Sequence, residues 1–270
     1  MSAGPADARP EKRWIGRSFG AAAQGYDAVA GLQRAVGREL LRLCPNECAT
    51  APALILDIGT GTGYCAARLV ESYPEARVLA LDVSEGMLRV ALERIGRSLR
   101  AGYLCADAAA LPFPDRSIDL VFSNLAIQWC PDPAAVLCEF GRVLKPGGRL
   151  LFSSFGPETL TELRQAFAAV DRYSHVNDFV PGPELERLLG AAGFCEVATA
   201  AEVRSMAYSG VAELMRELKS LGAHNVTAGR PRNLTGRRAF ERMIEAYPGR
   251  RGDGGIRASF EIILASGARQ

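Results

Sequence analysis

The sequence predicts an α/β protein with a doubly wound, mostly parallel β-sheet and helices on both faces. The first observation is the stretch 54–64, a short apolar run that breaks into glycines at alternate positions. The second is that short apolar runs alternate with helical patterns from there to residue 155. The third is that acidic residues, Asp82 and Asp107, close or follow the next two runs. Parallel strands covered on both faces read as such continuous apolar runs.

The region 51–155 is expected to supply the core of the sheet. We expect strands at 54–58, 77–83, 102–105, 118–124 and 149–155. Helices are expected between them at 64–72, 86–96 and 133–144, and a turn at 144–148. Crossovers between parallel strands are almost always right-handed, so these helices are expected to lie against the sheet.

The segments that flank this core are expected to cover it. Residues 1–16 are rich in Pro, Ala and charge, which predicts disorder, and a single domain is expected over 17–270. Cap helices are expected within 17–50, beginning at Arg17. The half at 156–250 is expected to cover a substrate. Its predicted elements, together with a final strand, are helices near 157–170, 183–192, 210–221 and 235–246, and strands near 194–206 and 257–266.

Composition excludes several classes of protein. The 32 basic and 30 acidic residues leave a net charge of +2, without the basic excess of a general nucleic-acid-binding protein. No apolar run reaches the roughly 18 residues of a membrane span, and the first residues carry no secretory pattern. Seven cysteines form no CxxC pair, which favours free thiols over disulfides or a metal site. We therefore expect a cytoplasmic protein that binds no metal, membrane or nucleic acid.

The glycine-rich loop after the first strand is a candidate binding site. Gly59, Gly61 and Gly63 allow tight turning and close approach of a ligand, because no Cβ intervenes. The pattern Gly61-x-Gly63-x-x-Ala66, with Asp82 about 20 residues on, also fits a dinucleotide fingerprint. At this point a nicotinamide or flavin enzyme therefore remains an alternative.

Acidic residues at neighbouring strand ends extend the candidate site. Asp82 can accept hydrogen bonds from ribose hydroxyls. Met87 can pack on an adenine ring. Asp107 can accept from the adenine amino group while the Ala108 amide donates to a ring nitrogen. Both acids can also serve as strand-end or capping residues.

These segments resemble the class I S-adenosylmethionine methyltransferases. DIGTGTG (57–63), ALDVS (80–84), ADA (106–108), DLVFSNLAIQW (119–129) and VLKPGGRL (143–150) stand in that family's order. The resemblance implies a seven-stranded Rossmann-like fold, with an antiparallel strand near the C-terminus, and no metal. A dinucleotide dehydrogenase would explain neither SNLAIQW nor LKPGG. The S-adenosylmethionine-binding residues that the resemblance implies are Asp57, Gly59, Thr60, Gly61, Gly63, Asp82, Val83, Met87, Asp107, Ala108 and Asn124.

Other segments are similar to the malonyl-[acyl-carrier protein] O-methyltransferases of biotin synthesis. They are FGAAAQGYDAVAGLQ (19–33), SNLAIQWC (123–130), LFSSFGPETLTEL (151–163), HVN (175–177) and LKSLGAHNVTAGR (218–230). Several lie outside the cofactor core, where methyltransferases generally diverge. One departure is Thr60, where that family often has Cys.

The resemblance implies transfer of a methyl group to the free carboxylate of a malonyl thioester on an acyl-carrier protein. A carboxylic acid is already ionised at neutral pH, so positioning suffices and no general base is required. The candidates for positioning are Tyr26, Gln128, Trp129, His175 and His224. The candidates for contact with the substrate or carrier are Lys219, Asn225, Arg230, Arg232 and Arg237. The alternatives are a methyltransferase for a quinone or other small molecule, and a non-catalytic S-adenosylmethionine-binding module.

Overall fold

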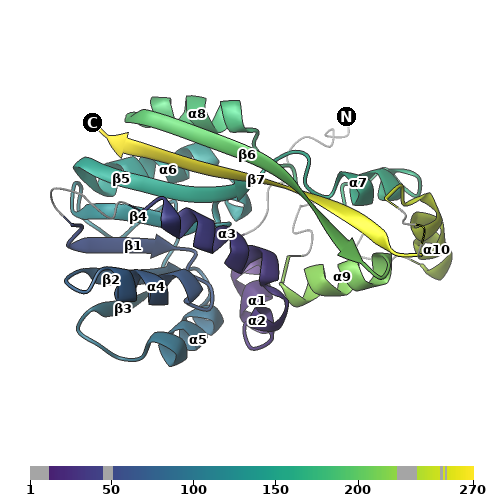
Figure 1. Ribbon diagram of the computed structural model, residues 1–270, viewed down its shortest axis with the longest axis horizontal. Helices are drawn as coiled ribbons and strands as arrows, with labels where there is room; N and C mark the ends of the chain where they lie inside the picture. The colour runs from purple at the N-terminus through teal and green to yellow at the C-terminus, as the bar shows by residue number, and fades with distance from the viewer. Residues whose placement is uncertain (1–11, 45–50, 224–235, 250–251, 253) are drawn as a thin grey trace, which may run out of the picture.

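The computed structural model describes residues 12–44, 51–223, 236–249, 252 and 254–270. Its centre is a seven-stranded sheet with the order β3-β2-β1-β4-β5-β7-β6 (Figure 1). The strands are β1 (Leu54–Ile58), β2 (Arg77–Asp82), β3 (Ala101–Cys105), β4 (Ile118–Asn124), β5 (Leu144–Phe155), β6 (Phe194–Tyr208) and β7 (Ile256–Arg269). Strands β1 to β5 pair in parallel, whereas β7 pairs antiparallel with both β5 and β6.

Helices lie on both faces of this sheet. In chain order they are α1 (Lys12–Ala22), α2 (Tyr26–Val29), α3 (Gly31–Arg42), α4 (Tyr64–Ser72), α5 (Glu85–Ile95), the 3₁₀ helix η1 (Ile127–Trp129), α6 (Pro133–Val143), α7 (Thr161–Ala168), α8 (Gly182–Ala191), α9 (Val211–Ser220) and α10 (Arg237–Ala246). The predicted α/β class, the doubly wound parallel core and the antiparallel C-terminal strand are confirmed.

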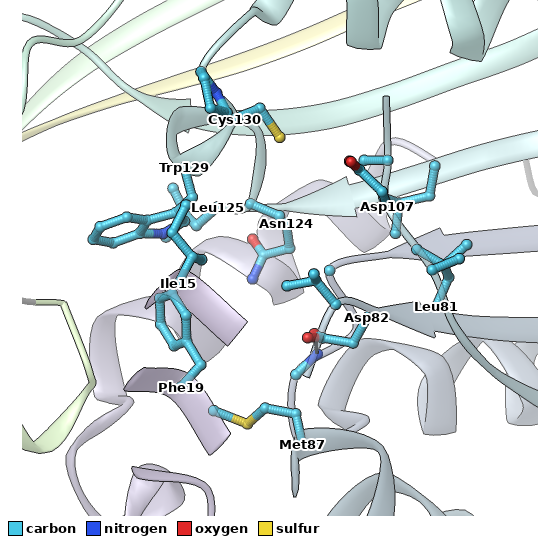
Figure 2. Close-up of a pocket in the computed structure, with 18 of the residues that line it drawn as sticks. Ile15, Phe19, Leu81, Asp82, Met87, Asp107, Asn124, Leu125, Trp129 and Cys130 are labelled. Carbon is cyan, nitrogen blue, oxygen red and sulfur yellow. Dashed lines mark hydrogen bonds between the residues drawn. The ribbon is translucent and has the colours of Figure 1, made fainter. Parts of the chain in front are cut away.

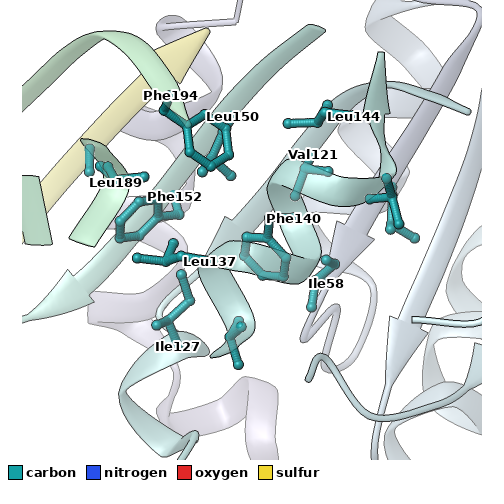
Figure 3. Close-up of a cluster of buried hydrophobic side chains, with 14 of the residues drawn as sticks. Ile58, Val121, Ile127, Leu137, Phe140, Leu144, Leu150, Phe152, Leu189 and Phe194 are labelled. Carbon is teal, nitrogen blue, oxygen red and sulfur yellow. The ribbon is translucent and has the colours of Figure 1, made fainter. Parts of the chain in front are cut away.

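Alternation along the strands sends side chains to two separate cores. On one face Val121 and Phe152 pack with Phe140 of α6 and with α8 (Figure 3). On the other face Phe122 packs in the core that α3 and α4 contribute to. Successive side chains of a strand point to opposite faces, so neighbours such as Val121 and Phe122 are buried on different sides. Both faces of the central strands β1 and β4 are therefore largely buried.

A third core supports the half of the chain after β5. Strand β7 pairs with β5 over 262–268, but it pairs with β6 from residue 256 onward. The two-stranded part therefore runs past the other strands toward α9 and α10 (Figure 1). Apolar residues of α7, α9 and α10 pack there against Phe260. This extension holds a helical layer beside the carboxyl ends of the parallel strands.

Two local expectations were wrong. Helix α1 begins at Lys12, so the disorder expected through residue 16 does not hold for 12–16. Ile15 is buried and α1 packs against α5, a tertiary contact that the polar composition of the segment did not reveal. The expected turn at 144–148 forms the irregular start of β5, where the pairing shifts between Ile118 and Leu120. Gly147, with φ of 75°, allows this irregularity.

Candidate active site

The candidate site lies where the strand order reverses. Strands β2 and β3 follow β1 on one side, whereas β4 returns to the other side of β1. In open α/β sheets, ligands bind outside the carboxyl ends of the strands at such a point. The glycine loop follows β1 at this position, and residues 125–129 follow β4.

The glycine loop is fixed by backbone hydrogen bonds to the end of β2. The N–H groups of Gly59 and Thr60 donate to the Leu81 carbonyl at 2.8 and 3.0 Å. A Cβ on Gly59 would lie 2.2 Å from the Ala126 Cβ, so this glycine permits close packing against the segment after β4. A Cβ on Gly61 would meet no atom within 4 Å, although its φ is +55°. Gly61 thus borders open space that a ligand can occupy.

Asp82 links the loop to the following helix. Its Oδ2 accepts from the Gly61 N–H at 2.9 Å and its Oδ1 from the Ser84 N–H at 2.8 Å. Ser84 in turn caps α5, because its hydroxyl accepts from the Met87 N–H. Burial raises the pKa of Asp82 to about 6, although these backbone donors oppose the shift. The carboxylate therefore orders two segments and still faces the cavity.

Asp57 lies beneath the loop. It is 1% exposed, and the Thr60 hydroxyl donates to its Oδ2 at 2.7 Å. Burial raises the pKa of Asp57 to about 7, with a smaller contribution from the charge of Asp82, although the hydrogen bond from Thr60 opposes the shift. Asp57 therefore holds the loop from below through Thr60.

We call the cavity at these strand ends the strand-end pocket. Its lining comprises Ile15, Phe19, Tyr26, Ile58, Gly59, Gly61, Leu81, Asp82, Val83, Met87, Ala106, Asp107, Ala108, Asn124, Leu125, Ala126, Trp129, Cys130 and Pro131. Figure 2 shows Asp82, Asp107 and Met87 toward the strands, with Phe19 of α1 across from them. Phe19 contacts Trp129 edge to face, with ring centroids 5.2 Å apart. The N-terminal helix thus forms one wall of this pocket.

A second cavity, which we call the cover pocket, adjoins the first. Its lining comprises Phe19, Tyr26, Leu32, Gln33, Leu125, Gln128, Trp129, Phe155, Thr159, Leu160, Leu163, His175, Val176, Asn177, Phe179, Glu217, Leu218, Leu221, Ala223 and Phe260. Four residues line both pockets, namely Phe19, Tyr26, Leu125 and Trp129. A group held in one pocket therefore meets a group held in the other at this junction.

Helix α2 places Tyr26 at the junction. The next residue, Asp27, accepts from the Thr62 hydroxyl at 2.8 Å and forms an ion pair with Arg94. These contacts tie α2 to the glycine loop and to α5. Burial, with the charges of Asp82 and Asp27, raises the pKa of Tyr26 further above its usual value. Its phenol is therefore a neutral hydrogen-bond donor at physiological pH.

Comparison with known proteins identifies the family. The profile of the family described as "Methyltransferase domain" matches residues 56–152. Over 97% of its length the chain is 48% identical to the malonyl-[acyl-carrier protein] O-methyltransferase of Methylococcus capsulatus, and the match covers 95% of that protein. This chain belongs to that methyltransferase family. It is accordingly an S-adenosylmethionine-dependent methyltransferase, and the resemblance stated from its motifs is confirmed.

A second relative supports this assignment, and a solved structure shares the fold. The malonyl-[acyl-carrier protein] O-methyltransferase of Gallionella capsiferriformans is 42% identical, over 94% of this methyltransferase and 89% of the relative. The crystal structure of the [4+2]-cyclase SpnF is similar with a TM-score of 0.62, at 20% identity and 97% coverage of each chain. At this identity the structural likeness shows the fold alone.

Most of the residues predicted to bind S-adenosylmethionine meet at one cavity of the methyltransferase. Eight of them line the strand-end pocket: Gly59, Gly61, Asp82, Val83, Met87, Asp107, Ala108 and Asn124. Asp57 and Thr60 line a smaller cavity under the loop instead. Gly63 starts α4 with φ of 79° and lines none of the three cavities. Both ends of the Asn124 amide are used internally, toward the Gln33 carbonyl and the Ser153 hydroxyl.

Four of the five residues predicted to position the acceptor meet in one cavity. Tyr26, Gln128, Trp129 and His175 line the cover pocket. His175 also stacks on Phe167, with centroids 3.7 Å apart, and lies 2.9 Å from an Asp171 carboxylate oxygen. His224 lies outside the described residues, as do three carrier candidates, Asn225, Arg230 and Arg232.

The two described carrier candidates lie outside the pockets. Lys219 is exposed on α9, and Arg237 is exposed on α10, where it pairs with Glu241 at 2.9 Å. Neither lines any of the three cavities. Within the described part of the chain, no group of three or more His, Cys, Asp or Glu residues is placed to hold a metal ion. The same residues include no helix long and apolar enough to cross a membrane.

Several pocket residues were missed from the sequence. They include Ile15, Gln33, Leu125, Asn177 and Glu217. Leu125 has φ of +49°, and its N–H donates to the Ser153 hydroxyl. A leucine in the sequence does not predict a positive φ, so this backbone geometry gave no signal. The HVN segment does contain Asn177, and its similarity to the family was the one signal available for it.

Proposed function

We propose that this methyltransferase converts the free carboxylate of malonyl-[acyl-carrier protein] to its methyl ester, a step of biotin synthesis. The observation that carries the proposal is the 48% identity to a relative of that name over nearly the whole chain. The match includes the covering half, which differs most among proteins of this fold, and not only residues 56–152. The junction between two adjoining pockets offers a place where donor and acceptor can meet.

The strand-end pocket has the features that S-adenosylmethionine requires. Bound there, the cofactor would supply an electrophilic methyl group on a sulfonium. We assign Asp82 to the ribose hydroxyls, because each carboxylate oxygen retains acceptor capacity beyond one backbone donor. Met87 would pack on the adenine, with Asp107 and Ala108 at its edge. The open space beside Gly61 leaves room for close backbone approach.

The acceptor needs orientation and exclusion of water, and it needs no base. The malonyl carboxylate is ionised at neutral pH, so an oxygen lone pair is ready to attack. At the junction, the neutral Tyr26 phenol and the Trp129 indole N–H can donate to that carboxylate. Aromatic walls from Phe19 and Trp129 exclude water, which favours a reaction that neutralises two opposite charges.

A transfer assay tests the proposal. Purified enzyme with methyl-labelled S-adenosylmethionine is offered malonyl-, succinyl- and acetyl-carrier protein. We expect label on malonyl-carrier and none on acetyl-carrier, which has no free carboxylate. Label on none of the three thioesters, but on a quinone or another small molecule, would assign the chain to a different reaction. Binding of S-adenosylmethionine without any transfer would indicate a non-catalytic module.

Cofactor binding is expected to release protons near pH 6. Burial raises the pKa of Asp82 to about 6, so at that pH Asp82 is protonated in about half of the free enzyme molecules. The ionised form accepts ribose hydroxyls and attracts the sulfonium, so binding favours deprotonation. Affinity should therefore fall as pH drops below 6, by up to about tenfold per unit. Calorimetry in buffers of different ionisation enthalpy should detect proton release at pH 6 and little at pH 8.

The Asp82→Asn variant is the control for this linkage. It should bind more weakly and release fewer protons at pH 6, because the titrating group has been removed. Equal proton release by the variant would assign the titration to another group, of which Asp57, with a pKa raised to about 7, is the first candidate. No release by the wild-type enzyme at pH 6 would contradict the role of Asp82.

We further propose that α9 and α10 present the surface that docks the carrier. Lys219 on α9 and Arg237 on α10 are exposed, and Leu218 of α9 and Leu221, just after that helix, line the cover pocket. Carrier proteins of this type are acidic, so exposed cations would speed association, and salt would screen the effect. A thioester delivered beside α9 enters the cover pocket directly.

Reversing both charges, Lys219→Glu with Arg237→Glu, should raise the KM for malonyl-carrier several-fold at low ionic strength. The increase should shrink at high salt, and the KM for malonyl-coenzyme A should barely change. Arg149→Glu with Arg187→Glu makes the same change in net charge on β5 and α8, and should leave both KM values unchanged. Equal losses with both substrates would place the two cations in the active site, and no loss would place docking elsewhere.

A further inference from the structure

All the buried polar side-chain atoms that lack a hydrogen-bond partner in the described chain belong to residues that line the cover pocket, and one of these residues, Gln33, also lines the smaller cavity under the glycine loop. These atoms are Gln33 Oε1, Gln128 Oε1 and Asn177 Oδ1. They come from α3, from η1 and from the segment after α7, and all three residues line the cover pocket. All three are amide carbonyl oxygens, so the cavity gathers hydrogen-bond acceptors from distant parts of the sequence.

Such atoms are rare in folded proteins, because a buried acceptor without a donor loses its hydration and gains nothing in return. Asn177 is 8% exposed, and its Oδ1 has no hydrogen-bond partner among the described residues. Gln128 is fixed in orientation, because its Nε2 donates to the Leu125 carbonyl at 2.8 Å. Rotating that amide would place two oxygens against each other, so Gln128 presents an acceptor.

The rest of the cover pocket supports a ligand that donates hydrogen bonds. Glu217 adds another acceptor, since among the described residues its carboxylate accepts from the Tyr208 hydroxyl alone, at 2.9 Å. Most of the remaining lining is apolar, as in Phe155, Leu163 and Phe260. No described lining residue is Lys or Arg. This part of the pocket is therefore poorly suited to hold a carboxylate and well suited to N–H and O–H groups.

The thioester arm of the carrier substrate provides such groups. A pantetheine arm carries two amide N–H groups and a hydroxyl on an otherwise apolar chain, whereas the malonyl carboxylate carries no donor. We propose that Asn177, with Gln33 and Gln128, accepts hydrogen bonds from the pantetheine arm and so determines specificity for arm-bound thioesters. The inference rests on the proposed function. It places the malonyl carboxylate at the junction beside Tyr26 and the arm in the cover pocket.

The Asn177→Leu variant tests this assignment, because leucine has a similar shape and no polar atoms. Two quantities are measured: the KM for malonyl-carrier, and the inhibition constant of free pantetheine, which has the arm and no carboxylate. Both should rise about tenfold, and by similar factors, while kcat changes little. The melting temperature should stay the same or rise, since the substitution removes an unpaired acceptor.

Thr159→Val is the matched control. Thr159 also lines the cover pocket, but its hydroxyl is already used, accepting from the Glu261 N–H at 3.1 Å and donating to the Glu261 carbonyl. Its loss should lower the melting temperature and leave the inhibition constant of pantetheine unchanged. Gln33→Met is a second test of the amide oxygens, should Asn177→Leu fold poorly, and it should also weaken pantetheine binding.

The outcomes separate the inference from the proposed function. If the KM for malonyl-carrier rises and pantetheine inhibition does not change, the amides hold the malonyl group, and the inference is wrong. It is also wrong if pantetheine fails to inhibit the wild-type enzyme, or if Asn177→Leu alters neither constant. If the wild-type enzyme methylates no malonyl thioester, the proposed function fails, and calorimetry with pantetheine still decides the inference.

Discussion

Replacing Gly61 by valine is expected to abolish S-adenosylmethionine binding while the protein remains folded. A Cβ at Gly61 meets no protein atom within 4 Å, so the added side chain would project into the space proposed for the cofactor. The φ of +55° adds strain of about 1–2 kcal/mol, which a domain of this size can tolerate. Affinity should fall by more than about a hundredfold, equivalent to about 2.7 kcal/mol.

Variants of two other glycines distinguish the effect of backbone strain from that of a side chain that fills the cofactor space. Gly147 also has a positive φ, of 75°, and open space around its Cβ, so Gly147→Val should cost some stability and leave affinity unchanged. Gly59→Ala should instead unfold or strongly destabilise the protein, because its Cβ would lie 2.2 Å from that of Ala126. Calorimetric titration and thermal melting measure both effects. A folded Gly61→Val enzyme with wild-type affinity would show that the loop does not contact the cofactor.

Replacing Asp82 by alanine is expected to weaken S-adenosylmethionine binding about tenfold to a hundredfold, or roughly 1.5–3 kcal/mol. The change removes the proposed acceptor for the ribose hydroxyls. It also frees the Gly61 and Ser84 N–H groups, which Asp82 holds at 2.9 and 2.8 Å. Cofactor binding would then also have to order the glycine loop, which would make the binding free energy less favourable. The dissociation constant, measured by calorimetry at pH 8, checks the expected loss.

Asp119 offers a matched control for this substitution. It also accepts from two backbone N–H groups, those of Ala53 and Leu54, at 3.1 and 2.8 Å. It lies near the beginning of β1, at the opposite edge of the sheet from the pockets. Asp119→Ala should lower the melting temperature and leave the dissociation constant unchanged. Equal losses of affinity in the two variants would mean that Asp82 acts through stability alone.

The parallel core was predictable because its signals are local. Each strand of 54–155 is an apolar run, and a strand buried on both faces requires such a run wherever it lies in the sheet. Strand β3 begins one residue before its predicted start, and β2 ends one residue before its predicted end. The start of α1 was missed, because Ile15 becomes buried only through contacts with a distant part of the chain. Composition alone reports the polarity of such a segment and not its partners.

The strand-end pocket and the cover pocket also differ in how far their residues could be predicted from the sequence. The cofactor candidates sit at the ends of consecutive strands, and parallel strands bring their carboxyl ends together at one edge, so Asp82 and Asp107 were predictable neighbours. The cover pocket joins α3, η1, α7 and α9, which no periodicity relates. Apart from the family similarity of the segments that contain them, Asn177 and Gln33 therefore had no signal in the sequence, since an amide side chain in a loop or helix is most often solvated. Their lack of partners became visible only in the folded chain.

The position of the transferred methyl group tests the central claim most directly. The enzyme is incubated with S-adenosylmethionine carrying a carbon-13 methyl and with malonyl-carrier, and the product is examined by nuclear magnetic resonance after release from the carrier. The proposed attack by the carboxylate oxygen predicts one labelled O-methyl ester signal, which alkaline hydrolysis converts to labelled methanol. A label on the malonyl carbon or on sulfur would resist that hydrolysis, and would contradict methylation of the free carboxylate.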